Sequence, residues 1–173
     1  MNNPVESLLE DDHASLDELL TELDEQLSKS NVSRAVELLD LFWARLAVHI
    51  RAEHLHLFPA LTNAASQITG KGSLPTLDEV EETLARLRSD HDFFMKELAD
   101  MMKETRARRP VVEIFRARLS TVRKRLETHN EIEEKQVYVW PALLFDEKTV
   151  IALGERLSYE LKNLPPRFST NRP

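Results

Sequence analysis

A pattern of histidine and glutamate that occurs twice constrains the fold of this chain more than any other feature of its sequence. His49 is followed four residues later by Glu53, and His129 is followed four residues later by Glu133. Residues four apart lie about one turn apart on the same face of an α-helix. The pattern therefore predicts two helices that each present an imidazole and a carboxylate to the same object.

A lone histidine precedes each of these pairs by the length of one helix and a turn. His13 lies 36 residues before His49, and His91 lies 38 residues before His129. A polar or proline-containing break falls near the middle of each interval. In an antiparallel helical hairpin, both members of a histidine pair would therefore lie at the same level.

The rest of the composition favours helices over strands. The 173 residues include 3 glycines and few runs of β-branched residues, while 42% are hydrophobic and 31% are charged. This leaves little material for hairpins but enough apolar surface for one well-buried domain. We predict an all-α fold, an antiparallel up-down-up-down four-helix bundle with an additional short C-terminal helix.

Capping signals and breaks place five helices along the chain. The first begins at a capping box of Asn3 and Glu6 around Pro4, and Thr76 with Glu79 gives a similar signal for the third. The predicted bounds are 4–29, 32–65, 76–107, 110–139 and 148–164.

We predict a single domain over residues 1–164, followed by a flexible tail over residues 165–173 that is polar and proline-rich. The sequence contains no cysteine, which excludes disulfides and thiol-based metal sites. The first residues lack the basic start and apolar core of a signal peptide, and no apolar stretch is long enough to span a bilayer. We therefore predict a soluble, cytoplasmic protein that does not bind membranes.

All four histidines lie on helix faces that are predicted to point into the core. His91, for example, shares its face with Leu87, Phe94 and Leu98. Burying imidazoles and carboxylates without partners is very unfavourable, and a pair of metal ions between them would remove that cost. Imidazole nitrogen and carboxylate oxygen suit iron, manganese or zinc. The predicted ligands are His13, His49, Glu53, His91, His129 and Glu133.

With these motifs the chain resembles the hemerythrin-like proteins, also called the HHE cation-binding domain family. The resemblance covers His13 to Leu143 and rests on the two lone histidines and on the segments HIRAE and HNEIE. It implies a non-haem centre of two iron ions, bridged by Glu53, Glu133 and an oxo or hydroxo group. Such a centre reacts with dioxygen, peroxide or nitric oxide. Manganese and zinc are alternatives to iron.

The chain departs from the family pattern at several positions. Oxygen-carrying hemerythrins have a fifth histidine where this chain has Met95 or Leu87, which puts reversible oxygen transport in doubt. The family tends to place a second acid after the first glutamate of each motif; Glu134 keeps it, but His54 replaces it in the first copy. The cysteine-containing N-terminal segment of members that repair iron-sulphur clusters is absent.

Other polar and aromatic residues near the motifs have plainer interpretations. His56 shares the metal-facing stripe and is predicted to line the pocket, with ligation as an alternative. His54 is offset from that stripe by about 140° and is predicted to lie at the surface or between helices. Asp12 and Asp90 are predicted to form caps or surface salt bridges. For Tyr138, as for both tryptophans, core packing is favoured over a role in the pocket wall or in electron transfer.

Two classes of function remain open from the sequence. One is redox chemistry on dioxygen, peroxide or nitric oxide, which would make the protein an oxidoreductase. The other is iron or oxygen sensing, storage or delivery without turnover. A basic run over 103–125 faces acidic residues of the first helix in the predicted bundle, so we predict no nucleic-acid binding. The sequence indicates no particular oligomeric state.

Overall fold

The computed structural model describes residues 3–68, 73–107 and 111–168, and this part of the chain is helical without any β-strand. The all-α prediction is therefore confirmed. The elements are α1 (Pro4–Ser28), α2 (Val32–Ala52), η1 (Glu53–Leu57), α3 (Phe58–Ser66), α4 (Leu77–Ala107), α5 (Val112–Ile132), η2 (Glu133–Val137), α6 (Trp140–Leu144), α7 (Glu147–Leu161) and η3 (Pro166–Phe168).

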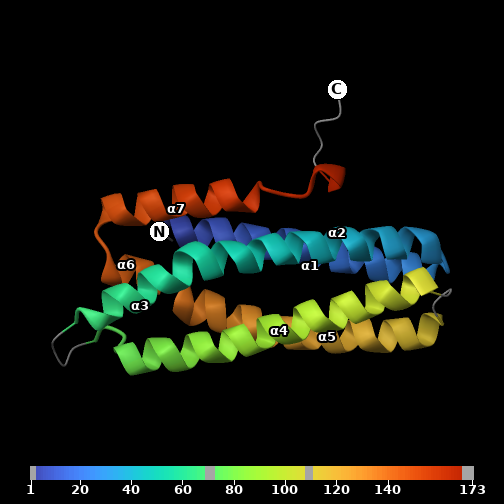
Figure 1. Cartoon of the computed structure of the whole chain (residues 1–173), viewed down its shortest axis with the longest axis horizontal. Coiled ribbons are helices and arrows are strands. Elements are labelled where there is room, and N and C mark those ends of the chain that lie inside the picture. Colours follow the sequence, from blue (N-terminus) through green and yellow to red (C-terminus); the bar gives the residue numbers. More distant parts are fainter. Residues whose placement is uncertain (1–2, 69–72, 108–110, 169–173) are drawn as a thin grey trace.

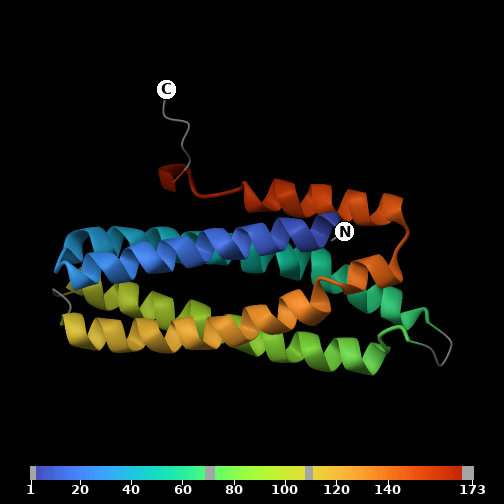
Figure 2. The ribbon, with the colours of Figure 1, turned by 180° about the vertical axis from the view of Figure 1, so that it is seen from behind.

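The long helices form a bundle of two pairs. Helices α1 and α2 lie side by side along the longest axis, and α4 and α5 form a second pair beneath them (Figures 1 and 2). Contacts of α2 with α4 and of α1 with α5 join the pairs. The short helices α3 and α6 lie together at one end, and α7 packs against the outside of α1 and α2.

The first helix begins as the sequence predicts. The side chain of Asn3 accepts hydrogen bonds from the backbone N–H groups of Val5 and Glu6, and Glu6 accepts one from the backbone of Asn3. This reciprocal arrangement satisfies N–H groups that a helix start leaves without partners. Asn3 also donates to the carbonyl of Tyr138 at 2.9 Å, so the start of α1 is held against the segment after η2.

The second and fourth predicted helices are not continuous, and this corrects the sequence-based bounds. Each is interrupted by a π-helix of 5 residues that begins at the motif glutamate, at Glu53 in η1 and at Glu133 in η2. A proline follows each π-helix, Pro59 two residues after the end of η1 and Pro141 four residues after the end of η2, and proline cannot donate a helical hydrogen bond. The predicted start of the fourth helix at Pro110 lies outside the described residues.

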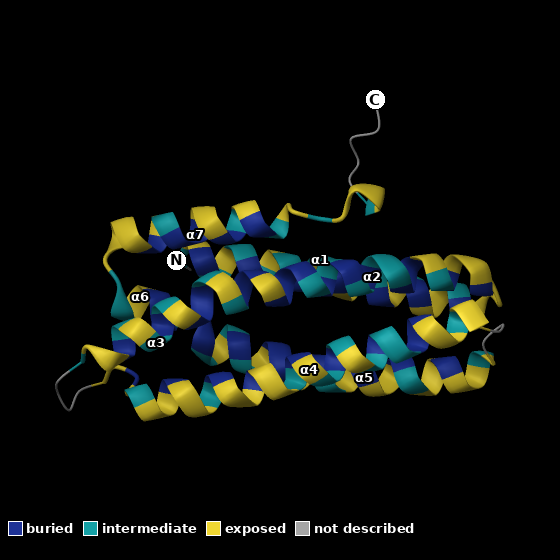
Figure 3. Ribbon diagram, viewed as in Figure 1, coloured by how far each residue is buried: buried dark blue, intermediate teal, exposed yellow. Residues whose placement is uncertain are grey.

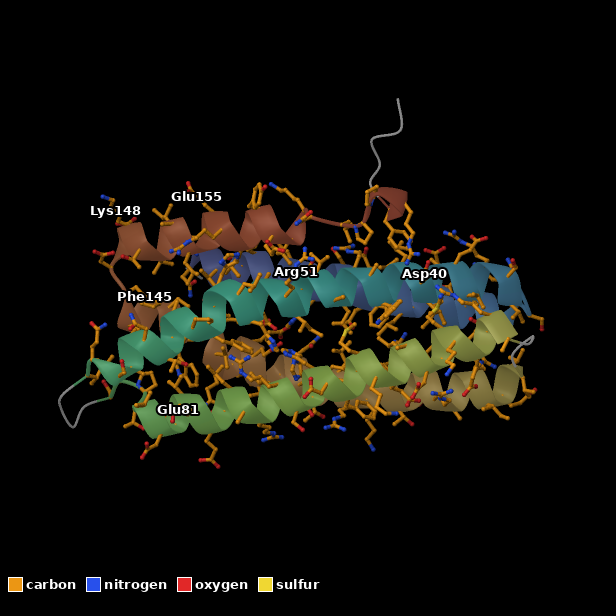
Figure 4. The ribbon with its side chains drawn as sticks, viewed as in Figure 1. Asp40, Arg51, Glu81, Phe145, Lys148 and Glu155 are labelled. Atoms are coloured by element: carbon orange, nitrogen blue, oxygen red, sulfur yellow. The ribbon has the colours of Figure 1, made fainter. Side chains whose placement is uncertain are left out.

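The core consists of two apolar clusters with the histidines between them. In α1, Leu9 belongs to one cluster and Leu16 to the other, and His13 lies between these positions. In α4, Leu87 and Phe94 are divided in the same way around His91. Figure 3 shows buried residues along the facing sides of the helices, and Figure 4 shows side chains filling the space between the two pairs. A polar layer therefore crosses an otherwise apolar core.

The C-terminal segment is attached to α2 by polar contacts. Arg51 forms an ion pair with Glu160 of α7, and Arg167 in η3 donates to Asp40 at 2.9 Å. Arg51 and Asp40 are labelled in Figure 4 on α2, the helix that carries these contacts. Of the predicted flexible tail, residues 169–173 lie outside the described residues. In the described part of the chain, no helix combines the length and the apolar character that crossing a membrane requires.

Candidate metal centre

The six predicted ligands meet in the polar layer between the two apolar clusters. None of the six residues is more than 3% exposed, and both glutamates are fully buried. Two subsets have ligand atoms within 4.8 Å of one another and could each hold a metal ion. One subset is His13, His49 and Glu133, and the other is His91, His129 and Glu133. We call the first the α1–α2 half of the centre and the second the α4–α5 half.

In the α1–α2 half, donor atoms from separate helices face one another across a short gap. The Nε2 atoms of His13 and His49 are 3.3 Å apart. Glu53 Oε1 lies 3.6 Å from His49 Nε2, and Glu133 Oε2 lies 3.4 Å from His13 Nε2. These four atoms therefore form a set of nitrogen and oxygen donors suited to iron, manganese or zinc.

The α4–α5 half repeats this arrangement with the other oxygen of each glutamate. The Nε2 atoms of His91 and His129 are 3.0 Å apart. Glu133 Oε1 lies 3.0 Å from His129 Nε2, and Glu53 Oε2 lies 3.4 Å from His91 Nε2. Each carboxylate thus directs one oxygen to each half, as a carboxylate that bridges two metal ions must do.

Two orphaned oxygen atoms test whether metal ions fit this site. Glu53 Oε2 and Glu133 Oε1 are buried and accept no hydrogen bond of normal geometry in the described structure; their polar neighbours are His91 Nε2 at 3.4 Å and His129 Nε2 at 3.0 Å. Leaving a buried carboxylate oxygen without a partner is costly, and native structures satisfy such atoms. Both atoms belong to the α4–α5 half, where a metal ion would bind them together with the imidazoles. The donor set therefore fits a metal ion at this position.

The outward-facing Nδ1 atoms of His49 and His129 are held by carboxylates, which fixes how these two rings are oriented. Asp12 accepts from His49 Nδ1 at 2.9 Å and from Arg45 at 2.8 Å. Asp90 accepts from His129 Nδ1 at 3.3 Å and from Arg125 at 2.7 Å. Donation from Nδ1 leaves the Nε2 lone pair free for a metal ion. Asp12 and Asp90 do form salt bridges, as predicted, but they also orient candidate metal ligands.

The partners of the two lone histidines come from the opposite half of the chain. Glu134, in η2, accepts from His13 Nδ1 at 2.8 Å. His54, in η1, lies 2.9 Å from His91 Nδ1. Burial and the neighbouring His91 lower the pKa of His54, which favours its neutral form, and a neutral imidazole can accept a hydrogen bond from His91 Nδ1. His54 therefore lies between helices, which is one of its two predicted positions. It also contacts His91, one of the six predicted ligands.

The two π-helices decide which residues face the centre after each glutamate. The backbone N–H of Phe58 bonds to the carbonyl of Glu53, and that of Tyr138 bonds to Glu133 at 2.8 Å. Such a turn contains one more residue than an α-helical turn, so the core-facing positions shift by one. The structure does not bring His56 to the cluster; its Nε2 lies 4.0 Å from Glu160 Oε2 of α7.

Tyr138 is the functional residue that sequence reasoning placed in ordinary core packing. It is fully buried, and its hydroxyl lies 2.8 Å from Glu53 Oε1 and 3.1 Å from Glu133 Oε2. Burial, together with the carboxylates of Glu133 and Glu53, raises the pKa of Tyr138 well above its ordinary value, so the metal-free protein holds a neutral phenol here. A comparison of the two motifs, with Phe58 and Tyr138 each five residues after the glutamate, would have singled it out.

Charges within the layer compensate one another in the metal-free protein. Burial lowers the pKa of His49, but Glu53 and Asp12 outweigh this effect and hold that pKa well above its ordinary value. Burial likewise raises the pKa of Glu133, but His129 and the other imidazoles hold it well below its ordinary value. Protonated imidazoles and ionised carboxylates thus occupy the same space. Metal ions can replace these protons, because metal ligands must be deprotonated.

The comparisons with known proteins agree with this geometry. The model of the hemerythrin HHE cation-binding domain family matches residues 5–140 of the chain. The chain therefore belongs to the hemerythrin HHE cation-binding family. Searches of curated proteins and of solved structures return no significant match.

Proposed function

We propose that this member of the hemerythrin family holds two iron ions in an antiparallel, up-down-up-down helical bundle and binds or reacts with dioxygen, peroxide or nitric oxide. Glu53 and Glu133 would bridge the two ions, and a pair of histidines would complete each half. The observation that carries the proposal is that each carboxylate directs one oxygen to each half, and that one oxygen of each accepts no hydrogen bond.

When bound, the two ions supply redox equivalents and Lewis acidity to a small ligand. The protein's own residues orient the imidazoles through Nδ1 and exclude water. Phe94 meets the ring of His129 edge-on at 5.3 Å, and Phe58 stacks on His91 at 6.0 Å. Because the donor atoms are buried beneath such rings, the site favours ligands of a few atoms over organic substrates.

The basic run over 103–125 has protein partners in the described structure, which supports our prediction that nucleic acid is not a ligand. Arg116 lies 3.6 Å from Asp24 of α1. Arg118 contacts both Glu97 and Glu104 of α4, at 2.6 Å and 2.9 Å. These pairs hold neighbouring helices together on the surface, where each contributes little stability by itself. We propose an intracellular protein whose ligands are metal ions and small molecules.

The same site would serve iron or oxygen sensing, storage or delivery without turnover. In that case ligand or metal occupancy would alter helix packing, because both halves share the glutamates. The burial of all six ligand residues in one layer across the bundle is the feature that favours this second function.

Metal content and absorption spectra of the purified protein test the proposal. We expect two iron ions per chain and spectral changes on adding dioxygen, peroxide or nitric oxide. His49→Ala should lose metal and response, whereas His56→Ala, which alters a histidine near Glu160, should keep both. Failure of the wild-type protein to take up iron would contradict the proposal. So would a His49→Ala variant whose absorption spectrum, and whose consumption of peroxide or nitric oxide, equal those of the wild type.

A further inference from the structure

The hydroxyl of Tyr138 lies among the donor atoms of the α1–α2 half. In addition to its contacts with Glu53 and Glu133, Tyr138 Oη is 3.1 Å from His13 Nε2 and 3.4 Å from His49 Nε2. All four donor atoms of this half are thus within hydrogen-bonding distance of one phenol oxygen. A phenol carries a single proton and can donate it to only one of them.

The distances among these five atoms are those of neighbouring ligands around one ion. With metal–ligand bonds of about 2.1 Å, adjacent donors of an octahedral site are separated by about 3.0 Å. Tyr138 Oη lies between 2.8 Å and 3.4 Å from the four other atoms. Among these four atoms, His13 Nε2 lies 3.3 Å from His49 Nε2 and 3.4 Å from Glu133 Oε2. His49 Nε2 lies 3.6 Å from Glu53 Oε1. The hydroxyl therefore occupies a ligand position.

The α4–α5 half has no hydroxyl at the corresponding place. Its counterpart is Phe58, which follows Glu53 by five residues as Tyr138 follows Glu133, and whose backbone N–H donates the same type of π-helical hydrogen bond to the glutamate carbonyl. Phe58 is fully buried and stacks on His91 with an interplanar angle of 6°. The two halves thus place an aromatic ring beside the lone histidine, and only one ring carries a donor atom.

We propose that Tyr138 is a seventh protein ligand, whose phenol oxygen binds the metal ion held by His13 and His49. This inference rests on the proposed iron centre and deepens it. The phenol releases its proton to solvent when the metal binds, as other ligands do. One ion then has five protein donors and the other has four, so an exogenous ligand binds the ion held by His91 and His129.

Ferric iron bound to phenolate gives a visible charge-transfer band and resonance-enhanced tyrosine ring vibrations, which are the test. The chain has 2 tyrosines, and Tyr159 is 76% exposed on α7, so it provides a matched control. We expect the band and the ring vibrations in the iron-loaded wild type and in Tyr159→Phe, and their loss in Tyr138→Phe. In Tyr159→Phe grown with ring-deuterated tyrosine, the vibrations should shift, because Tyr138 is then the sole tyrosine.

Iron content separates failure of this inference from failure of the proposed function. If the wild type and Tyr159→Phe each bind two ferric ions but show no tyrosine vibrations, the ligation by Tyr138 is overturned. The proposed iron centre is then unaffected. Absence of bound iron from the wild type would overturn both. Ring vibrations that persist in Tyr138→Phe would assign the phenolate to another residue and also overturn the ligation. The labelled Tyr159→Phe protein keeps the test decisive even if Tyr138→Phe does not fold.

Discussion

The two halves of the candidate centre share one backbone plan but differ in the groups that surround the proposed metal positions. In the α1–α2 half, the lone histidine is backed by the carboxylate of Glu134 and neighboured by the hydroxyl of Tyr138. In the α4–α5 half, the equivalent positions hold a neutral imidazole, His54, and a phenyl ring, Phe58. A carboxylate partner makes an imidazole a stronger donor. One half is therefore richer in donors, while the other leaves more positions open.

This difference shows how a repeated motif can give unlike metal sites without any change in the helices. Both π-helices begin at a glutamate shared by the two halves, and the next residue of each contacts the lone histidine of the opposite half. The two halves differ at two equivalent places, where one has glutamate and tyrosine and the other has histidine and phenylalanine; in our proposal this difference separates a site that holds its ion from a site that can exchange a ligand.

The largest expected effect comes from giving the α4–α5 half the phenol that it lacks. In Phe58→Tyr, the added hydroxyl should occupy an open position beside His91, so that the iron-loaded protein no longer forms an azide complex. Azide titration followed by absorption is the measurement, with helicity and iron content as controls. Undiminished azide binding by a folded, fully loaded Phe58→Tyr protein would contradict the asymmetry between the halves.

A smaller effect should follow from removing the partners of the two lone histidines one at a time. Loss of such a partner typically lowers metal affinity by about 10–100-fold. We expect this loss in Glu134→Ala, and a smaller loss in His54→Ala, because a neutral imidazole strengthens its neighbour less than a carboxylate does. Competition with a chelator measures both affinities, and Glu131→Ala, on the exposed face of α5, is the control. A weaker effect for Glu134→Ala than for His54→Ala would reverse the ranking.

The smallest effect concerns how pH affects the stability of the metal-free protein. Glu133 has a folded pKa below its ordinary 4.5, so its stabilising contribution is complete above pH 4.5 and is lost as pH falls through the folded value. His49 has a folded pKa above 6.5, so its contribution is complete below pH 6.5 and is lost as pH rises. Each unit of difference is worth about 1.4 kcal/mol.

Denaturant unfolding of the metal-free protein should therefore give the highest free energy of unfolding between pH 4.5 and 6.5. In the iron-loaded protein the alkaline loss should disappear, because the metal then holds the imidazoles deprotonated. An equal alkaline loss with and without iron would show that these imidazoles are not the metal ligands.

Much of this architecture could be predicted from the sequence, because local rules control it. The capping box at Asn3 and the polar layer follow from hydrogen bonding at a helix start and from the spacing of helical residues. Asp12 could not be placed in the same way. In a bundle, a helix touches two neighbours, so the residue beside a core position faces the adjacent helix; here it meets His49.

The π-helices are the main feature that sequence reasoning could not supply. Helical spacing assumes a constant turn, and it assigned His56 to the metal-facing stripe. The longer turn after Glu53 moves Phe58 into the core and leaves His56 near Glu160. The same turn after Glu133 brings Tyr138 to the ligands. A single extra residue in a turn depends on packing and bonding across the bundle, which a periodic pattern does not record.

The polar layer also fixes the lengthwise register of the helices. If α5 slid along α4 by one turn, about 5.4 Å, His129 would leave His91 and enter one of the apolar clusters. Glu133, which follows α5, would then face apolar side chains, and buried charge without a partner is far more costly than a misplaced methyl group. Apolar side chains alone tolerate such sliding better, since one leucine can replace another. The candidate metal ligands thus also select a single alignment of the bundle.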